Sequence, residues 1–159
     1  MTELRIDALP ATHPDAVALL DAFVAEVRAR LGEFDPARSV SADPDEMAPP
    51  RGAFLVLYDG GAPVACGGIK TLEPGVAEVK RMFVAREARG RGHGRVLLAA
   101  LEDAARAMGA ARVVLDTAAP LVEAHRLYAA SGYRDVAPYN ANPYAARWFE
   151  KDLRATPNR

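Results

Sequence analysis

The residues best suited to bind a ligand lie between positions 84 and 95, where closely spaced glycines are surrounded by arginines. Glycine removes the side chain where a ligand must approach the backbone. The free N–H groups and positive dipole end of a helix that starts here would favour a phosphate. Arginines add charges suited to a diphosphate and a further phosphate. The sequence predicts an anion-binding loop made of Arg89, Gly90, Arg91, Gly92, His93, Gly94 and Arg95.

A glycine-rich turn that only lets a helix pack on a sheet is the alternative interpretation of this loop. The loop is not a Walker motif, because no Gly-Lys-Ser/Thr follows, and it does not open a series of strand–helix–strand units as a Rossmann loop does. His93 is interpreted as a spacer whose backbone amide faces the phosphate. No histidine has cysteine or histidine neighbours at ligand spacing, so no metal site is predicted.

Hydrophobic periodicity predicts the elements that position this loop. The first helix is expected to be capped by Thr12, with Asp15 completing a capping box. An α/β (α+β) fold, with a mixed sheet of about seven strands and helices on both faces, is the simplest packing of the predicted order. The pattern predicts strands at residues 4–9, 53–58, 63–71, 76–84, 112–117, 133–136 and 145–153, and helices at residues 13–31, 94–108 and 121–130.

Length and composition indicate one ordinary globular domain. The chain has 159 residues, predicted to form a domain at residues 1–154 with a disordered tail at residues 155–159. The formal net charge is −1, so neither nucleic acid nor an anionic membrane is expected as a partner. The single cysteine, Cys66, lies in an apolar run and is expected to be buried. No membrane span or signal peptide is evident, so a cytoplasmic location is expected.

Three motifs at matching separations resemble a known family. Arg89-x-x-Gly92-x-Gly94 matches the Arg/Gln-x-x-Gly-x-Gly/Ala motif of the GNAT superfamily of N-acetyltransferases. The segment 78–84 resembles the fourth strand of that family, and the segment 124–133 resembles its fourth helix. The resemblance extends over nearly the whole chain and implies an enzyme that moves an acetyl group to an amine.

The resemblance implies acetyl-coenzyme A as the cofactor. In the family the fourth and fifth strands splay apart, and the pantetheine arm lies in the gap like an added strand. Backbone groups of Met82, Phe83 and Val84 are therefore expected to bind this arm. A strand amide is expected to stabilise negative charge that develops on the thioester oxygen, while the loop amides hold the pyrophosphate.

Transfer to an amine requires a base, because a lysine-like amine has a pKa of about 10.4 and is protonated at neutral pH. Glu78 is the first candidate, since an ideal strand places it on one face with the even-numbered residues up to Val84. A bulge would reverse this phase. Asp116, at the end of a neighbouring strand, is the second candidate. A salt bridge of Glu78 with Lys80 or Arg81 is the alternative interpretation.

Tyr128 occupies the position at which the family carries its general acid, which protonates the leaving thiolate. A core tyrosine on an apolar helix face is the alternative interpretation. Many relatives place an asparagine seven residues earlier, where this chain has Leu121, so the cofactor contact at that point differs.

The acceptor site in this family is formed by the first helix with the loop after it and by the loop before the last strand. Here these segments are residues 28–50 and 137–147. Acids in the first segment would attract an amine, or they are simply solvated. Tyrosine and asparagine in the second suit a small polar or aromatic substrate, or reflect turn chemistry. The candidate contacts are Glu33, Tyr139, Asn140 and Tyr144.

These features predict an N-acetyltransferase that acts on a primary amine of a small molecule by direct attack in a ternary complex. Amino acids, polyamines, antibiotics and protein N-termini are the acceptors left open. The alternatives are a non-catalytic acyl-coenzyme A sensor that regulates a protein partner, and a protein N-terminal or lysine acetyltransferase. Glu78 and Tyr128 favour an enzyme, because a sensor needs only the loop. Both a monomer and a homodimer agree with the sequence.

Overall fold

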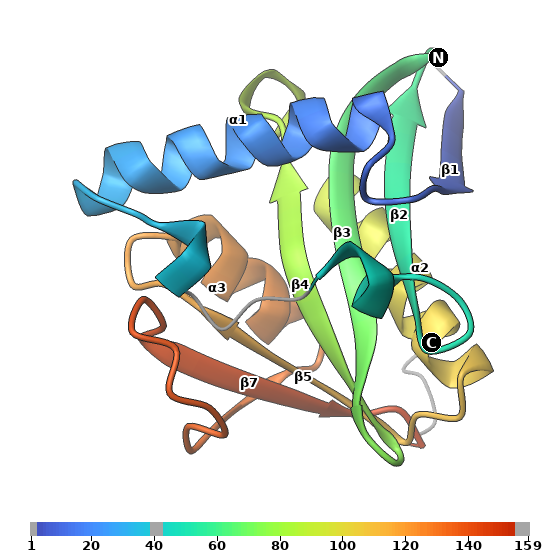
Figure 1. The fold of residues 1–159 in the computed structure, drawn as a ribbon, viewed down its shortest axis with the longest axis vertical. Coiled ribbons are helices and arrows are strands. Elements are labelled where there is room, and N and C mark those ends of the chain that lie inside the picture. Colours follow the sequence, from blue (N-terminus) through green and yellow to red (C-terminus); the bar gives the residue numbers. More distant parts are fainter. Residues whose placement is uncertain (1–2, 39–42, 155–159) are drawn as a thin grey trace.

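A computed structural model describes residues 3–38 and 43–154 and contains a seven-stranded mixed sheet (Figure 1). The strand order is β1-β2-β3-β4-β5-β7-β6, in which β4 and β5 are parallel neighbours. The predicted element order and fold class are confirmed, and the expected tail at residues 155–159 lies outside the described residues. The strands are β1 (Leu4–Ala8), β2 (Gly52–Asp59), β3 (Ala62–Glu73), β4 (Val76–Val84), β5 (Arg112–Thr117), β6 (Arg134–Val136) and β7 (Arg147–Asp152). The helices are α1 (Pro14–Leu31), α2 (His93–Ala107) and α3 (Val122–Ala130), with short 3₁₀ turns η1 (Pro36–Arg38), η2 (Pro44–Met47) and η3 (Arg86–Ala88).

Helices cover both faces of the sheet. α1 crosses one face (Figure 1), where an apolar cluster includes Phe54, Cys66 and Phe83. On the opposite face, Leu97 and Leu101 of α2 share a larger cluster with residues of α3 and the strands. Cys66 is buried as predicted, and burial raises the pKa of its thiol to about 12. Among the described residues, no helix has the length and apolarity needed to cross a membrane.

α1 begins with a different cap from the predicted one. His13 is the N-cap, and its Nδ1 accepts a hydrogen bond from the Asp15 amide at 3.1 Å. Pro14 fills the first helical position, where a missing N–H leaves no bond unmade. The prediction of Thr12 as the cap is therefore wrong, because the histidine ring nitrogen performs the role expected of a hydroxyl. Gly32 ends the helix as its position indicated, with φ of 82°.

β4 contains a bulge near its middle. Gly68 of β3 pairs with Lys80, and Cys66 pairs with Phe83, so three steps along β4 match two steps along β3. Arg81 lies in this bulge and has φ of 56°. This left-handed conformation is uncommon for a residue that carries a side chain.

The bulge exchanges the faces of the residues that follow it. Val79 packs on the α2 side of the sheet, so Glu78 faces the α1 side. Beyond the bulge, Met82 and Val84 pack on the α2 side and Phe83 packs on the α1 side. The prediction that Glu78 shares a face with the even-numbered residues up to Val84 is therefore wrong, because one extra residue reverses the alternation.

β4 and β5 are paired only near their starts. Their ladder runs over three positions and ends where Glu78 pairs with Val114. The strands then diverge, as the resemblance implied, while β5 continues in register with β7 up to Thr117. β7 therefore lies inside the sheet, between β5 and β6, and Phe149 on it belongs to the core. The divergence leaves space between β4 and β5 on the side where α1 and α3 approach each other.

Candidate active site

The glycine-rich loop lies at the N-terminus of α2. Gly90 and Gly92 have φ of 82° and 81°, and an added Cβ at either position would meet nothing within 4 Å. Backbone conformation therefore requires glycine at both positions. Gly92 is the N-cap, and no side chain caps this helix. The first-turn N–H groups lack a capping side chain at a pocket lined by Gly92, His93, Gly94 and Arg95, which fits a pyrophosphate.

The charged residues of the loop make different contacts. Arg89 donates to a carbonyl at the end of β4 at 3.0 Å and to Glu26 of α1 at 2.6 Å, so its guanidinium braces the loop. Arg91 is exposed and lies 3.9 Å from Asp59. The His93 ring is buried with Nε2 3.1 Å from the same carboxylate, which anchors the loop on β2. Arg95 is exposed and lines the pocket, where it can meet a phosphate.

A charged strap joins α1 to α3 beside the loop, and it consists of Glu26, Arg30, Arg89 and Glu123. Arg30 donates to both carboxylate oxygens of Glu123, at 2.6 and 2.9 Å, and lies 3.5 Å from Glu26. The hydrogen bond from Arg30 lowers the pKa of Glu123 to about 2. All four residues line the pocket that contains the loop. The strap therefore fixes the spacing of α1 and α3 at this pocket.

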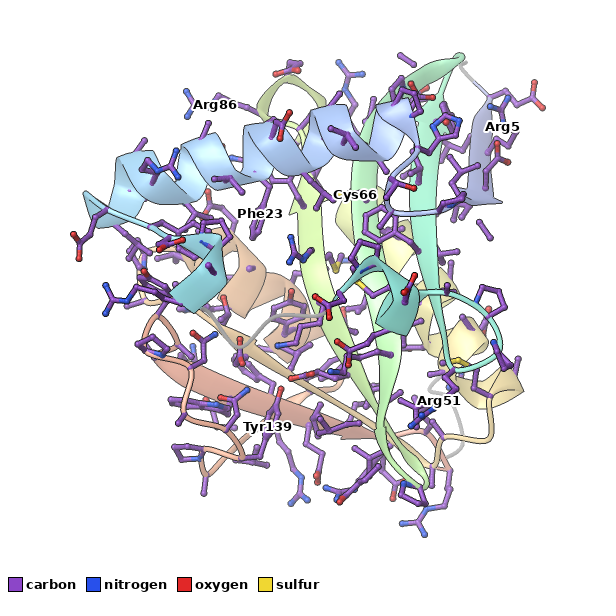
Figure 2. The ribbon with its side chains drawn as sticks, viewed as in Figure 1. Arg5, Phe23, Arg51, Cys66, Arg86 and Tyr139 are labelled. Carbon is purple, nitrogen blue, oxygen red and sulfur yellow. The ribbon has the colours of Figure 1, made fainter. Side chains whose placement is uncertain are left out.

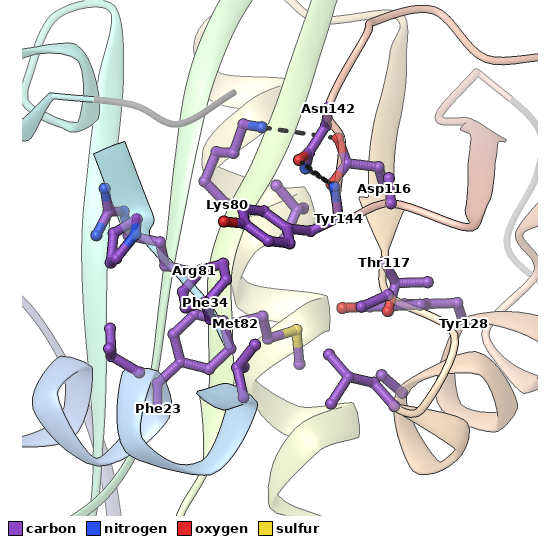
Figure 3. Close-up of a pocket in the computed structure, with 18 residues that line it drawn as sticks. Phe23, Phe34, Lys80, Arg81, Met82, Asp116, Thr117, Tyr128, Asn142 and Tyr144 are labelled. Carbon is purple, nitrogen blue, oxygen red and sulfur yellow. Dashed lines mark hydrogen bonds and ion pairs between the residues drawn. The ribbon is translucent and has the colours of Figure 1, made fainter. Parts of the chain in front are cut away.

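Two adjoining pockets occupy the region where β4 and β5 diverge. The loop pocket, of about 330 Å³, is lined by the loop, the strap and the end of β4 from Met82 to Val84. The sheet pocket, of about 120 Å³, is lined by residues of β4, β5, α1 and the loop before β7 (Figure 3). Both pockets are lined by Phe23, Val27, Met82, Leu121, Ala124 and Tyr128. They therefore form one continuous site, with Leu121 presenting an aliphatic side chain to both parts.

Tyr128 extends from α3 toward the junction of the two pockets (Figure 3). The residue is only 6% exposed. Burial, and next the charge of Asp116, raises the pKa of its hydroxyl. The hydroxyl is therefore protonated at neutral pH and can donate a proton to a base formed beside it.

Glu78 lies behind the sheet pocket and does not line it. The residue is 1% exposed and lies 3.1 Å from the Lys80 ammonium. It also accepts a hydrogen bond from the Tyr139 hydroxyl at 2.6 Å. Burial and the Glu78 charge raise the pKa of Tyr139, so this hydroxyl keeps its proton. The sequence had two interpretations of Glu78, a catalytic base and a salt-bridge partner, and the structure contains the salt bridge with Lys80.

Asp116 lines the sheet pocket together with Tyr128. Its carboxylate oxygens accept hydrogen bonds from the amide groups of Asn140, at 2.6 Å, and Asn142, at 3.2 Å. The Lys80 ammonium lies 3.9 Å away. These contacts hold the carboxylate at the pocket wall, so the second candidate base is the one that faces the space beside Tyr128.

The predicted acceptor residues occupy different places. Tyr144 lines the sheet pocket, whereas Tyr139 and Asn140 stand behind it as partners of Glu78 and Asp116. Glu33 is exposed just beyond α1 and lines neither pocket.

Sequence reasoning missed Phe34, Lys80 and Arg81 as lining residues of the sheet pocket. The two cations had been considered only as salt-bridge partners of Glu78. The available signal was a pair of adjacent cations inside an otherwise apolar strand, Val79 to Val84. Charged residues at such positions are rarely buried without a partner or a function.

β4 and β5 diverge beside the N-terminus of α2, which no side chain caps, and the sheet pocket lies where they diverge. This combination is that of an acyl-coenzyme A-dependent N-acyltransferase. The family model for the acetyltransferase (GNAT) family matches residues 19–133, and the chain belongs to this family. It is 39% identical over 144 residues to a protein named IAA acetyltransferase from Azospirillum brasilense, covering 87% of this chain and 92% of that protein.

Solved structures have the same fold. A putative acyl-CoA N-acyltransferase from Klebsiella pneumoniae matches with a TM-score of 0.72 and 28% identity, covering 94% of this chain and 97% of that chain. A GNAT family acetyltransferase from Elizabethkingia anophelis with acetyl-CoA bound matches with a TM-score of 0.65 and 15% identity, covering 94% and 98%. The protein is an N-acetyltransferase that uses acetyl-coenzyme A, and its loop pocket fits the pyrophosphate of that molecule.

Proposed function

We propose that the enzyme acetylates a primary amine of a small molecule by direct attack in a ternary complex. The observation that carries this proposal is the junction of the loop pocket with the sheet pocket at Met82 and Tyr128. One pocket has the helix N-terminus that suits a pyrophosphate, and the other offers a separate space for an acceptor. The small volume of the sheet pocket, about 120 Å³, favours a small molecule over a protein segment. The name of the Azospirillum relative is consistent with this choice.

Acetyl-coenzyme A supplies the acetyl thioester when it is bound. The first-turn amides of α2 and the Arg95 guanidinium would hold its phosphates. Met82, Phe83 and Val84 line the same pocket, and their backbone groups would hold the pantetheine arm beside β4. Holding both reactants at the junction brings amine and thioester together, which by itself lowers the barrier.

The residues at the junction have complementary tasks. Asp116 accepts one proton from the ammonium, which frees the nitrogen lone pair to bond to the acetyl carbon. The second proton, which the nitrogen loses as the amide forms, passes to solvent. Tyr128 donates its hydroxyl proton to the sulfur as the carbon–sulfur bond breaks. Exchange with solvent then returns a proton to the tyrosine and removes one from the carboxylate. Glu78 remains the alternative base, and it would act through the Lys80 ammonium, which pairs with it and lines the pocket.

A thiol-release assay over a panel of primary amines tests this function, with acetyl-coenzyme A binding measured separately by titration calorimetry. We expect micromolar to millimolar binding and turnover with at least one small amine. Asp116→Asn is expected to lower kcat strongly, whereas Glu78→Gln is expected to lower it less. Binding without turnover across a broad panel would favour the non-catalytic sensor, and turnover confined to peptides would favour a protein acetyltransferase.

A further inference from the structure

Asp116 lies near the end of β5, directly opposite Trp148 of β7 in the antiparallel ladder. Its side chain is 11% exposed and lines the sheet pocket (Figure 3). Residues opposite each other in an antiparallel pair project from the same face of the sheet, so the indole and the carboxylate share one face. The loop before β7 places the amide groups of Asn140 and Asn142 against the same carboxylate. β7 and the loop before it therefore bring polar groups to the proposed base.

Trp148 fixes the direction in which the Asn140 amide points. The indole Nε1–H donates to Asn140 Oδ1 at 3.0 Å, and the backbone N–H of Asn142 donates to the same oxygen at 3.2 Å. Both groups can only donate, so the atom that they meet must be the amide oxygen. The amide nitrogen of Asn140 therefore faces Asp116, to which it donates a hydrogen bond at 2.6 Å.

The amide of Asn142 is oriented by the same principle. Its Oδ1 accepts a hydrogen bond from the backbone N–H of Tyr144 at 3.1 Å, and its amide nitrogen donates to the other Asp116 oxygen at 3.2 Å. Asn142 is only 9% exposed. Asn140, Asn142 and Trp148 together form an asparagine clamp, which directs one N–H donor at each oxygen of the carboxylate.

The clamp leaves the Asp116 carboxylate able to act as a base. An ionised carboxylate has about four acceptor sites, so sites remain for an ammonium. Donated hydrogen bonds favour the charged form of a carboxylate, which is the form that accepts a proton. The titratable side chains of the surrounding elements are Glu78, Lys80 and Arg81 of β4, Tyr128 of α3, and Tyr139 and Tyr144 of the loop before β7. Lys80 lies 3.9 Å from Asp116 and 3.1 Å from Glu78, so the clamp donors are closer to Asp116 than this ammonium is.

Building on the proposed function, in which Asp116 is the base, we propose that Asn140 and Trp148 are positioning residues for catalysis. The indole holds the Asn140 amide, and the amide keeps the carboxylate charged and directed at the space beside Tyr128. Asn140 and Trp148 line neither the loop pocket nor the sheet pocket. They therefore act through Asp116 and not by contact with the reactants.

Asn140→Asp tests the clamp with little change in shape. The substituted carboxylate can still accept hydrogen bonds from Trp148 and from the Asn142 backbone, but it replaces the donor to Asp116 by a second negative charge. We expect the acidic limb of kcat/KM against pH to move up by about one unit or more, and kcat at neutral pH to fall about tenfold. Affinity for acetyl-coenzyme A, measured by calorimetry, should stay unchanged.

Ala141→Asp is the matched control, because it adds the same charge to the same loop at an exposed residue. Solvent screens this charge, so the acidic limb should move by less than about 0.3 unit. An acidic limb that stays in place in Asn140→Asp, or that moves equally in both variants, would overturn the inference and leave the proposed function standing. No turnover by the wild type with any small amine would overturn the proposed function itself.

Trp148→Phe tests the outer contact of the clamp. Phenylalanine keeps a ring at this position but removes the N–H that orients the Asn140 amide. We expect kcat to fall about fivefold and the acidic limb to move in the same direction as in Asn140→Asp. In an Asp116→Asn background, Trp148→Phe should cause no further loss of kcat. An equal loss in both backgrounds would show that Trp148 acts by packing alone and would overturn its assignment.

Discussion

Tyr128 combines a position between two pockets with a hydroxyl that burial keeps protonated. Its ring is held by aromatic contacts with Tyr133 and Phe149, whose centroids lie 5.8 and 5.7 Å away. The hydroxyl therefore stays directed at the junction whether or not a ligand is bound. A proton donor at this point is useful only where a leaving group develops negative charge.

Tyr128→Phe is expected to lower kcat at least about tenfold, because the proton donor is lost while the ring contacts remain. Affinity for coenzyme A, measured by calorimetry, should be nearly unchanged. Tyr139→Phe is the matched control, because it removes a tyrosine hydroxyl from a residue outside both pockets, and it should lower kcat less. A normal rate in Tyr128→Phe would remove this residue from the mechanism.

At the scale of elements, the charged strap links α1 to α3, two helices that no backbone ladder joins. Arg30 also donates to the carbonyl of Pro120 at 3.2 Å, so it contacts both the start of α3 and the segment before it. Figure 2 shows α1 extended across the sheet, with side chains reaching from it toward the strands below. The loop pocket thus has one wall whose position depends on ion pairs.

Arg30→Ala is expected to weaken coenzyme A binding about fivefold, because the binding energy must then order α1 against α3. Calorimetry at low and high salt measures the effect, and salt should reduce the difference between the variant and the wild type. Arg106→Ala removes an exposed ion pair on α2 and should leave the affinity unchanged. Equal affinities for wild type and Arg30→Ala would show that the strap does not support the pocket.

The strap also makes stability depend on pH. The pKa of Glu123 is lowered from 4.5 to about 2 in the folded state, chiefly by the hydrogen bond from Arg30. Its contribution is therefore present above pH 4.5 and is lost as the pH falls toward 2. The effect should be small, because the Glu123 side chain is 55% exposed. Glu123→Gln should reduce this part of the acid dependence in urea unfolding, and an unchanged acid profile would exclude the strap as its cause.

At the scale of the whole molecule, one sheet carries two apolar layers and also forms the site. The layer under α2 and α3 contains Leu101, which is fully buried, and reaches Met82 and Tyr128 at the pockets. The core therefore supports both the position of the loop helix and the divergence of β4 from β5. Stability and activity are coupled through this shared layer.

Leu101→Ala is expected to lower the free energy of unfolding by about 2–5 kcal/mol, because it removes buried methyl groups and leaves a cavity. Val96→Ala on the same helix, at a residue 40% exposed, should cost less than about 0.5 kcal/mol. Urea unfolding measures both. Saturating coenzyme A should raise the stability of both variants by mass action. Similar losses in the two variants would contradict the assignment of Leu101 to the core.

Most of the fold could be predicted from local patterns, because strand and helix periodicities depend on near neighbours along the chain. The predicted cap of the first helix, Thr12, was wrong, because the ring of the next residue, His13, accepts the hydrogen bond that a hydroxyl was expected to accept. The candidate site was predictable where glycine spacing marked the loop. It was not predictable at Lys80 and Arg81, whose orientation depends on a register shift with a strand more than ten residues away.

The sequence by itself determined the element order and the helix-terminal loop, since both follow from residue type and spacing over short segments. Only the tertiary structure decided that Asp116, and not Glu78, lines the space beside Tyr128. The physical reason has two parts. The bulge in β4 makes the residues after it face the opposite side of the sheet from Glu78. The early end of the ladder between β4 and β5 opens the space beside Asp116 on β5.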